Sequence, residues 1–290
     1  MTASRLRKTV MIAAFEGWND AGSAASDALA HLTSIWDAKQ VGHLDPEDYH
    51  DFQVTRPLVH ITPEGRRTIT WPATTIWMAD LPDRRVLLVH GIEPSFRWKR
   101  YCDELLAIAR EFSVHTLITM GSLLADVPHT RPIPVSVSSE SSAVSALESD
   151  TDLGSLSPSN YEGPTGIVGI LQHFAAEDGL TGISLWAAVP HYVANPPSPK
   201  ATWALLTKVE ELLGHSIDMG DLAEDTEAWM HCVGELASED PDIAEYIEQL
   251  ERAQDTTDLP EASGDAIAKE FEQWLKRRGD SPGDNPGKGD

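Results

Sequence analysis

The sequence predicts an α/β fold in which a mainly parallel β-sheet is flanked by helices and followed by an acidic helical extension. Short apolar runs rich in β-branched residues alternate along the chain with amphipathic segments of helix length. This alternation is typical of a parallel sheet whose two faces are both covered by helices. The extension is indicated by charge, because acidic residues are concentrated in the last 70 residues of the chain.

The first predicted strand spans residues 9–14, an apolar run that ends in a polar turn. Asn19 or Asp20 then caps a helix predicted over residues 21–36, and small residues at its start let it lie close against the sheet. Residues 53–78 differ, because prolines and a glycine interrupt short β-prone pieces. They predict an antiparallel excursion at one edge of the sheet, with a hairpin turn at residues 63–65.

The rest of the α/β part repeats strands and helices. Strands are predicted at residues 85–90, 114–120, 132–138 and 183–189. Helices are predicted at residues 96–112 with Ser95 as the cap, at 163–178 closed by Gly179, and at 200–213. The serine-rich residues 141–159 are predicted to be a mobile connection. Because parallel strands open onto a common crevice at their carboxyl ends, the residues that follow each strand are the first candidates for a site.

Charge divides the chain near residue 215. Residues 221–290 contain 20 acidic and 6 basic residues, against 26 and 16 in the preceding 220. We therefore expect an α/β domain over residues 1–215, an acidic helical extension over 216–279 and a disordered tail over 280–290. Helices are predicted in the extension near residues 222–233, 241–253 and 265–278. They either pack as solvated amphipathic helices against the domain or form a docking arm for a partner or neighbouring subunit.

The composition excludes several classes of protein. A net charge of −24 argues against nucleic acid and anionic lipid as partners, since both need a basic surface. No run approaches the roughly 20 apolar residues of a membrane span, and the apolar stretch after the basic start is too short for a signal peptide. We therefore expect a cytoplasmic protein. Two distant cysteines and eleven histidines without ligand spacing predict no disulfide framework and no metal site, and no cofactor is expected.

Four short motifs follow the predicted strands in a fixed order. They are FEGWNDAG at residues 15–22, GS at 121–122, YEGPTGI at 161–167, and VPHY at 189–192, the last followed by a proline-rich corner and a helix. In that order they resemble the proteasome assembly chaperone 2 family, specifically its actinobacterial branch, over roughly residues 9–213. The resemblance implies a phosphorylase/hydrolase-like α/β sandwich and self-association, with a trimer as one expected form. Eukaryotic members help to assemble the α-ring of the proteasome, so proteasome subunits are the implied partners.

The candidate site consists of residues at or just beyond the ends of the predicted strands. The loop of residues 16–20 is either a structural turn and helix cap or the wall of a functional pocket, and it lacks the phosphate-cradling glycine patterns. Paired carboxylates at Glu16 and Glu93 would suit acid–base work. Ser122 is either a turn residue or a nucleophile, although it lacks the G-x-S-x-G elbow. The candidate pocket residues are Glu16, Gly17, Trp18, Asn19, Asp20, Glu93, Gly121, Ser122, His129, Arg131, Glu162, His191 and Tyr192.

Two pairs in this set leave alternatives open. His129 and Arg131 either present a cation to an acidic ligand or lie on a surface loop, where Arg131 would pair with Asp126. His191 and Tyr192 either line the crevice or form a packed, hydrogen-bonded pair at the edge of the sheet.

The sequence therefore supports three functional hypotheses and identifies no catalytic residue. The first is a homo-oligomeric protein-binding or assembly scaffold, which follows from the family resemblance. The alternative is a hydrolase or phosphorylase-like enzyme that acts on a small polar, nucleoside-like substrate at the strand-end crevice. The third is a metabolite-binding sensor without catalysis.

Overall fold

The computed structural model describes residues 9–139, 159 and 161–257. The chain divides into two compact units, Met1–Glu239 and Asp240–Asp290. The first unit contains the central sheet, and the helix α7 (Pro241–Thr257) belongs to the second. The domain boundary expected near residue 215 stays a prediction. The helix expected at 265–278, the tail at 280–290 and nearly all of the connection at 141–159 lie outside the described residues.

Seven strands form the central sheet in the order β2-β5-β6-β1-β7-β9-β8. Four neighbouring strands at its centre run parallel, and they are β6 (Arg84–Ile92), β1 (Thr9–Glu16), β7 (Val114–Ala125) and β9 (Thr181–Pro190). The carboxyl ends of these four strands therefore lie at one edge of the sheet, as the sequence predicts.

Antiparallel strands flank this parallel centre on both sides. β5 (Thr74–Leu81) pairs with β6, and β2 (Lys39–Leu44) pairs with β5. On the other side, β8 (Val135–Ser138) pairs with β9. The sheet is thus mixed but mainly parallel, which confirms the predicted α/β fold class.

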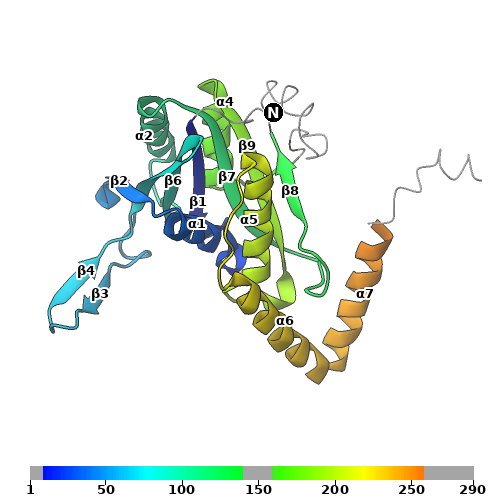
Figure 1. Ribbon diagram of the computed structural model, residues 1–290. Helices are drawn as coiled ribbons and strands as arrows, with labels where there is room; N and C mark the ends of the chain where they lie inside the picture. Colours follow the sequence, from blue (N-terminus) through cyan, green and yellow to red (C-terminus); the bar gives the residue numbers. More distant parts are fainter. Residues whose placement is uncertain (1–8, 140–158, 160, 258–290) are drawn as a thin grey trace, which may run out of the picture. The chain divides into compact units, whose positions relative to one another are not determined.

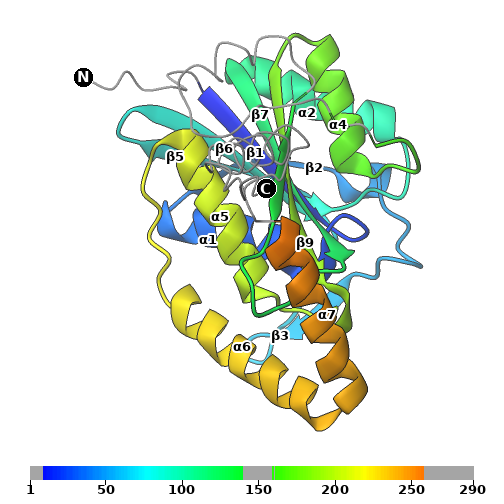
Figure 2. The same ribbon diagram turned by 90° about the vertical axis from the view of Figure 1, so that its right-hand side faces the viewer.

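Helices cover both faces of the sheet, and β1 shows why. Its side chains alternate between two separate buried clusters, with Val10, Ile12 and Ala14 in one and Met11, Ala13 and Phe15 in the other. The first cluster is completed by α1 (Ala24–Ile35) and α5 (Pro199–Leu213). The second is completed by α2 (Trp98–Glu111) and α4 (Ile167–Glu177). Figures 1 and 2 show these two helix pairs with the sheet between them.

The turn after β1 brings the starts of α1 and α5 together. Asp20 accepts hydrogen bonds from the Ala25 amide at 2.8 Å and the Ser26 hydroxyl at 2.5 Å. It thus serves the first turn of α1, as predicted of a cap, although the residue at the cap position is Ser23. Gly22 lies in the short helix η1 (Ala21–Ser23) with a φ of 61°. A Cβ at Gly22 would lie 2.7 Å from the Cβ of Ser198, so only glycine fits this approach of two chain segments.

Two predicted boundaries and one strand that was not predicted illustrate where the structure differs from the sequence analysis. The helix α2 begins at Trp98 after Arg97, which has a φ of 57°, and the hydroxyl of Ser95 accepts a hydrogen bond from the Asp51 amide instead of capping the helix. The strand β7 continues through Gly121 and Ser122 to Ala125, because its pairing with β9 continues to that point. β2 was not predicted, since its polar, half-exposed residues lack the pattern of a buried strand.

The antiparallel excursion forms a separate two-stranded sheet of β3 (Leu58–Ile61) and β4 (Arg67–Thr70). It projects away from the body of the first unit on the side of β2 (Figure 1). The predicted turn is confirmed by a hydrogen bond of 2.8 Å from the Gly65 amide to the carbonyl of Thr62. The antiparallel excursion predicted at one edge of the sheet is thus present between β2 and β5, and the last predicted piece, residues 76–78, lies in β5 of the main sheet.

Three further elements complete the described chain. The short helix η2 (Pro46–Asp48) follows β2, and η4 (His191–Val193) follows β9. The helix α6 (Leu222–Glu239) packs on α5 within the first unit. Among the described helices, none has a stretch that is both long enough and apolar enough to cross a lipid bilayer.

Candidate functional site

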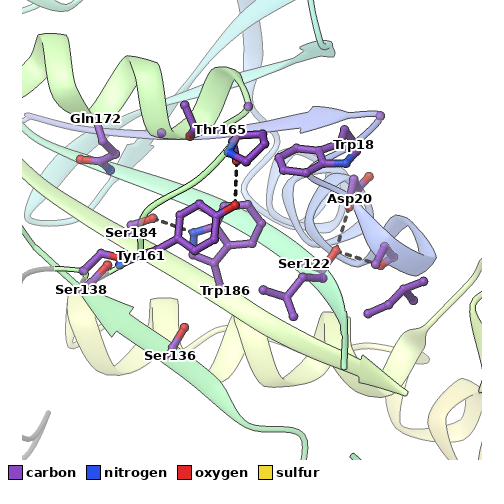
Figure 3. A pocket seen from close by; sticks show the side chains of 18 of the residues that line it. Trp18, Asp20, Ser122, Ser136, Ser138, Tyr161, Thr165, Gln172, Ser184 and Trp186 are labelled. Carbon is purple, nitrogen blue, oxygen red and sulfur yellow. Dashed lines mark hydrogen bonds between the residues drawn. The ribbon is translucent and has the colours of Figure 1, made fainter. Parts of the chain in front are cut away.

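A cleft of about 1200 Å³ opens where the carboxyl ends of β1 and β7 meet β8, β9 and the start of α4. Figure 3 shows its side chains, which come from all of these segments. Four of the thirteen predicted site residues line it, namely Gly17, Trp18, Asp20 and Ser122. Most ligand pockets for small molecules measure roughly 300–1000 Å³, so this cleft is large enough for a longer or bulkier partner.

The walls of the cleft are unusually apolar for an open surface. Trp18 and Tyr161 are 65% and 63% exposed, and the neighbouring Leu123 and Leu124 at the end of β7 are 44% and 49% exposed. Isolated apolar side chains on a surface need no explanation, but a group of four around one cleft is typical of a binding surface.

Trp186 of β9 also lines the cleft, and a glycine on the neighbouring strand makes room for it. A Cβ at Gly121 would lie 2.8 Å from the ring of Trp186, so a larger residue would displace that ring. The indole nitrogen of Trp186 donates a hydrogen bond of 3.1 Å to the hydroxyl of Ser184 (Figure 3). Gly121 therefore shapes the cleft without lining it.

The partly buried Glu93 and the buried Asn19 form a hydrogen-bonded group beside the cleft. One carboxylate oxygen of Glu93 accepts hydrogen bonds of 2.8 Å from the side-chain amide of Asn19 and from the Ile167 amide at the start of α4. A carboxylate at this position satisfies one of the free N–H groups of the helix and interacts favourably with its dipole. The Glu93 amide also donates to the carbonyl of Glu16 at 2.9 Å. Glu93 thus fixes α4 to the end of β1.

Asp20 and Ser122 connect the end of β7 to the turn after β1. The hydroxyl of Ser122 donates to the carbonyl of Ala21 at 2.8 Å, and its amide donates to the carbonyl of Asn19 at 2.8 Å. A serine hydroxyl that already donates to a backbone carbonyl has the geometry of a turn residue, the first of the two roles considered for it.

One carboxylate, that of Asp20, lines the cleft, and a second lies near it. The second is the half-exposed carboxylate of Glu16, which lies 3.5 Å from the Nε2 atom of His90. The nearby Asp27 is exposed, but its pKa is raised. The larger cause is desolvation by neighbouring atoms, and the smaller is repulsion from the charges of Asp20 and Glu16. Among the described residues that line the cleft there is no lysine or arginine to offset this charge.

The remaining predicted residues lie elsewhere. His129 is buried, and both its amide and its Nδ1 atom contact the hydroxyl of Tyr192, at 2.6 and 2.9 Å. Lys200 donates to the carbonyl of His129 at 2.5 Å, and burial followed by the charge of Arg131 lowers the pKa of that lysine. This group ties the β7–β8 connection to η4 and α5, and the residue with which Tyr192 bonds in it is His129.

His191 and Glu162 do not line the cleft either. His191 is partly exposed, and its Nδ1 atom lies 3.3 Å from the carboxylate of Asp126. Glu162 is exposed to solvent. In the described part of the chain, no three His, Cys, Asp or Glu side chains gather as a metal site would require.

Sequence reasoning missed most of the apolar cleft wall. Tyr161 lies in one of the four motifs, and Leu123 and Leu124 directly follow Ser122, so their positions beside candidate residues were a usable signal. Trp186 gave no such signal, because it lies inside a predicted strand and only the pairing of β9 with β7 brings it to the cleft.

Comparison with known proteins gives one family and several similar structures. The model of the PAC2 family matches residues 14–237. A PAC2 family protein from Streptomyces avermitilis is 49% identical, with a TM-score of 0.75 over 82% of this chain and 99% of that one. A Mycobacterium tuberculosis proteasome-assembly chaperone homologue is 46% identical, with a TM-score of 0.73 over the same shares. A search of curated proteins found no match.

A more distant structure shares the fold alone. An archaeal proteasome activator from Pyrococcus furiosus is 20% identical, with a TM-score of 0.62 over 79% of this chain and 93% of that one.

Proposed function

The chain belongs to the PAC2 family, and on this basis we propose that it is a homo-oligomeric scaffold that binds and helps to assemble other proteins. Its relative from Mycobacterium tuberculosis is described as a proteasome-assembly chaperone homologue, so proteasome subunits are the proposed client proteins. The cytoplasm is the proposed location. The observation that carries the proposal is the projecting hairpin of residues 54–71, hereafter the arm.

The arm exposes an apolar face that nothing in the described chain covers. Val59 pairs with Ile69 across the hairpin, and Ile61 follows Val59 on the same face. These three side chains are 52%, 56% and 74% exposed, and Trp71, which continues the face beyond β4, is 45% exposed. Contiguous apolar surface of this kind is a mark of protein–protein contact.

The arm is also poorly supported by its own chain. Every residue of β3 and β4 is exposed, so the hairpin packs on no other element along its length. At its base the ring of Trp71 contacts the ring of Phe52 at a centroid distance of 4.9 Å. An isolated two-stranded hairpin is marginally stable in water, so an ordered arm needs a partner surface.

Charge supports a second copy of this chain as the partner of the arm. The arm contains Arg56, Arg66 and Arg67 but only one acidic residue, Glu64, within a chain whose net charge is −24. Opposite charges steer surfaces together and disfavour wrong partners. A basic, apolar arm is therefore matched to the acidic surface of another copy.

We test this self-association with a double variant, Val59→Asp with Ile69→Asp. It places two charges on the apolar face, and we expect the assembled wild-type chain to become monomeric, as measured by light scattering coupled to size exclusion. The control is Leu236→Asp on α6, which alters a side chain of similar exposure, 59%, away from the arm. Circular dichroism checks that each variant is folded. A monomeric wild-type chain, or an arm variant as large as the wild type, contradicts the proposal.

The client part of the proposal has a separate test. Immobilised full-length chain is incubated with purified proteasome α-subunits from an actinobacterium. We expect the α-subunits to be retained, and we expect this retention to require self-association of the immobilised chain. The arm double variant should retain a smaller amount of α-subunit than the Leu236→Asp control does. Absence of retention under conditions in which an established assembly factor is retained would remove proteasome subunits as clients and leave self-association standing.

A further inference from the structure

We propose that the cleft at the carboxyl ends of β1 and β7 receives the arm of a second copy, so that the chains join head to tail. The inference rests on the self-association proposed above and names the surface that receives the arm. Four observations support it: the distribution of exposed apolar side chains, the size of the cleft, charge, and the topology of the sheet.

Exposed large apolar side chains are concentrated on these two surfaces. Among the described residues there are thirteen, of which six lie on the arm and four line the cleft. The arm contributes Val54, Leu58, Val59, Ile61, Ile69 and Trp71. The cleft contributes Trp18, Leu123, Leu124 and Tyr161. Aromatic anchors such as Trp18 and Tyr161 are typical of the centres of protein interfaces. Both surfaces therefore expose apolar area that contact between them would bury.

The cleft has the size for a hairpin. Its 1200 Å³ exceed the roughly 300–1000 Å³ of most small-molecule pockets. At about 3.3 Å per residue, the five steps from Leu58 to Pro63 at the turn extend the arm by roughly 17 Å, so its tip lies well away from its base. A projecting element and a cleft large enough to hold it are what a head-to-tail contact requires.

The two surfaces also carry opposite charge. The carboxylate of Asp20 lines the cleft, and Glu16 directly precedes Gly17 in its wall. Arg56, Arg66 and Arg67 give the arm its positive charge, and all three are exposed. Two acidic chains repel each other as wholes. The contact between a basic arm and an acidic cleft is attractive, and it offsets this repulsion locally.

Topology separates the arm from the cleft of its own chain. Leu44 at the end of β2 pairs with Thr74 at the start of β5, and Thr75 pairs with His90 near the end of β6, so the arm leaves from the same carboxyl edge that carries the cleft. Two to three strand spacings, roughly 10–14 Å, separate β5 from β1 and β7, at whose ends the cleft opens. The arm projects on the side of β2, away from β9 (Figure 1). One copy's arm thus faces outward to meet the next copy's cleft, and such contacts close into a ring when the rotation permits.

A mixing experiment distinguishes this arrangement from contact between two arms. The arm-deficient chain is the Val59→Asp, Ile69→Asp variant, and the cleft-deficient chain is Leu124→Arg, which puts a like charge in the path of the arm. Each variant alone should be monomeric. An equal mixture should form a one-to-one dimer, because the intact arm of one chain still fits the intact cleft of the other. Leu123→Arg is a second cleft variant, and Leu236→Asp is again the control that keeps the wild-type size.

The outcomes separate the two proposals. A dimer that forms only in the mixture supports the head-to-tail contact. A cleft variant that keeps the wild-type size, or a mixture that stays monomeric, overturns this contact, while loss of assembly in the arm variant still supports self-association. If the arm variant keeps the wild-type size, both proposals fail.

Discussion

At the scale of single residues, the site depends on how Glu93 is used. Its carboxylate was a candidate for acid–base work together with Glu16, but it accepts from Asn19 and Ile167 at 2.8 Å each and so joins three chain segments. Glu16 lies at the end of the neighbouring strand with its side chain half exposed and near His90. The two carboxylates therefore have different surroundings, and that of Glu93 is already engaged by the fold.

Replacing Glu93 should cost stability. Glu93→Ala leaves the side-chain amide of Asn19 and the Ile167 N–H at the start of α4 without their acceptor, and an unsatisfied buried donor costs about 1–3 kcal/mol. Glu93→Gln keeps an acceptor oxygen and removes only the charge at the start of the helix. Its free energy of unfolding should therefore fall by only about 0.3–1 kcal/mol. Chemical denaturation of each variant in the monomeric arm background measures these differences.

Glu162 provides the matched control, because it is an exposed glutamate just before the same helix. Glu162→Ala should change the free energy of unfolding by no more than about 0.5 kcal/mol. Equal losses at Glu93 and Glu162 would contradict the supporting role assigned to Glu93.

The same residues show how much of the site could be predicted from the sequence. The strand-end rule placed residues 16–20 and Ser122 correctly at one edge of the sheet, because it needs only the order and direction of the strands. It also included His129 and Tyr192, which follow strand ends but lie in a separate hydrogen-bonded group. Which way a side chain points beyond a strand end depends on how the loop packs, and no local pattern encodes that.

At the scale of whole elements, the two cysteines report on how their helices pack. Cys102 lies on the face of α2 that is buried against the sheet, where burial, followed by the charge of Asp103, raises the pKa of its thiol to about 12. Cys232 lies on α6 and is exposed. The thiolate is the reactive form of cysteine, so the two thiols should differ strongly in reactivity.

Thiol titration with a chromogenic disulfide reagent at neutral pH should therefore detect one fast thiol per native chain and two after denaturation. In Cys232→Ser the fast reaction should disappear, because Cys102 is both inaccessible and protonated. A fast native reaction that persists in Cys232→Ser would show that α2 does not pack on the sheet as described.

Elements with one strong local signal were predicted well. The apolar runs of β1 and β6 and the glycine that closes α4 were identified within a few residues, since burial on both faces leaves a continuous apolar run. β2 was missed because an edge strand tolerates polar and charged residues such as Lys39 and His43. The arm was recognised as a hairpin, but that it stands apart from the sheet is not a local property.

At the scale of the whole molecule, a net charge of −24 opposes both folding and assembly through repulsion between like charges. At the proposed contact the repulsion between chains is replaced by attraction, because the arm is basic and the cleft contains the carboxylate of Asp20. Added salt screens both effects, with a screening length of about 8 Å at physiological ionic strength. Folding and assembly should therefore respond to salt in opposite directions.

Between about 0.02 and 0.3 M sodium chloride, the melting temperature of the monomeric arm variant should rise, because screening relieves repulsion within the folded chain. A gain of about 1 kcal/mol would correspond to roughly 2–4 °C for a domain of this size. Over the same range the dissociation constant of the wild-type assembly, measured by sedimentation, should increase, because the arginines of the arm lose their attraction to the cleft. In Arg66→Glu with Arg67→Glu that attraction is already lost, so assembly should be weak at low salt and should strengthen as salt screens the remaining repulsion. If salt strengthened the wild-type assembly as well, apolar contact alone would hold the chains together, and the charge argument for the second copy would be wrong.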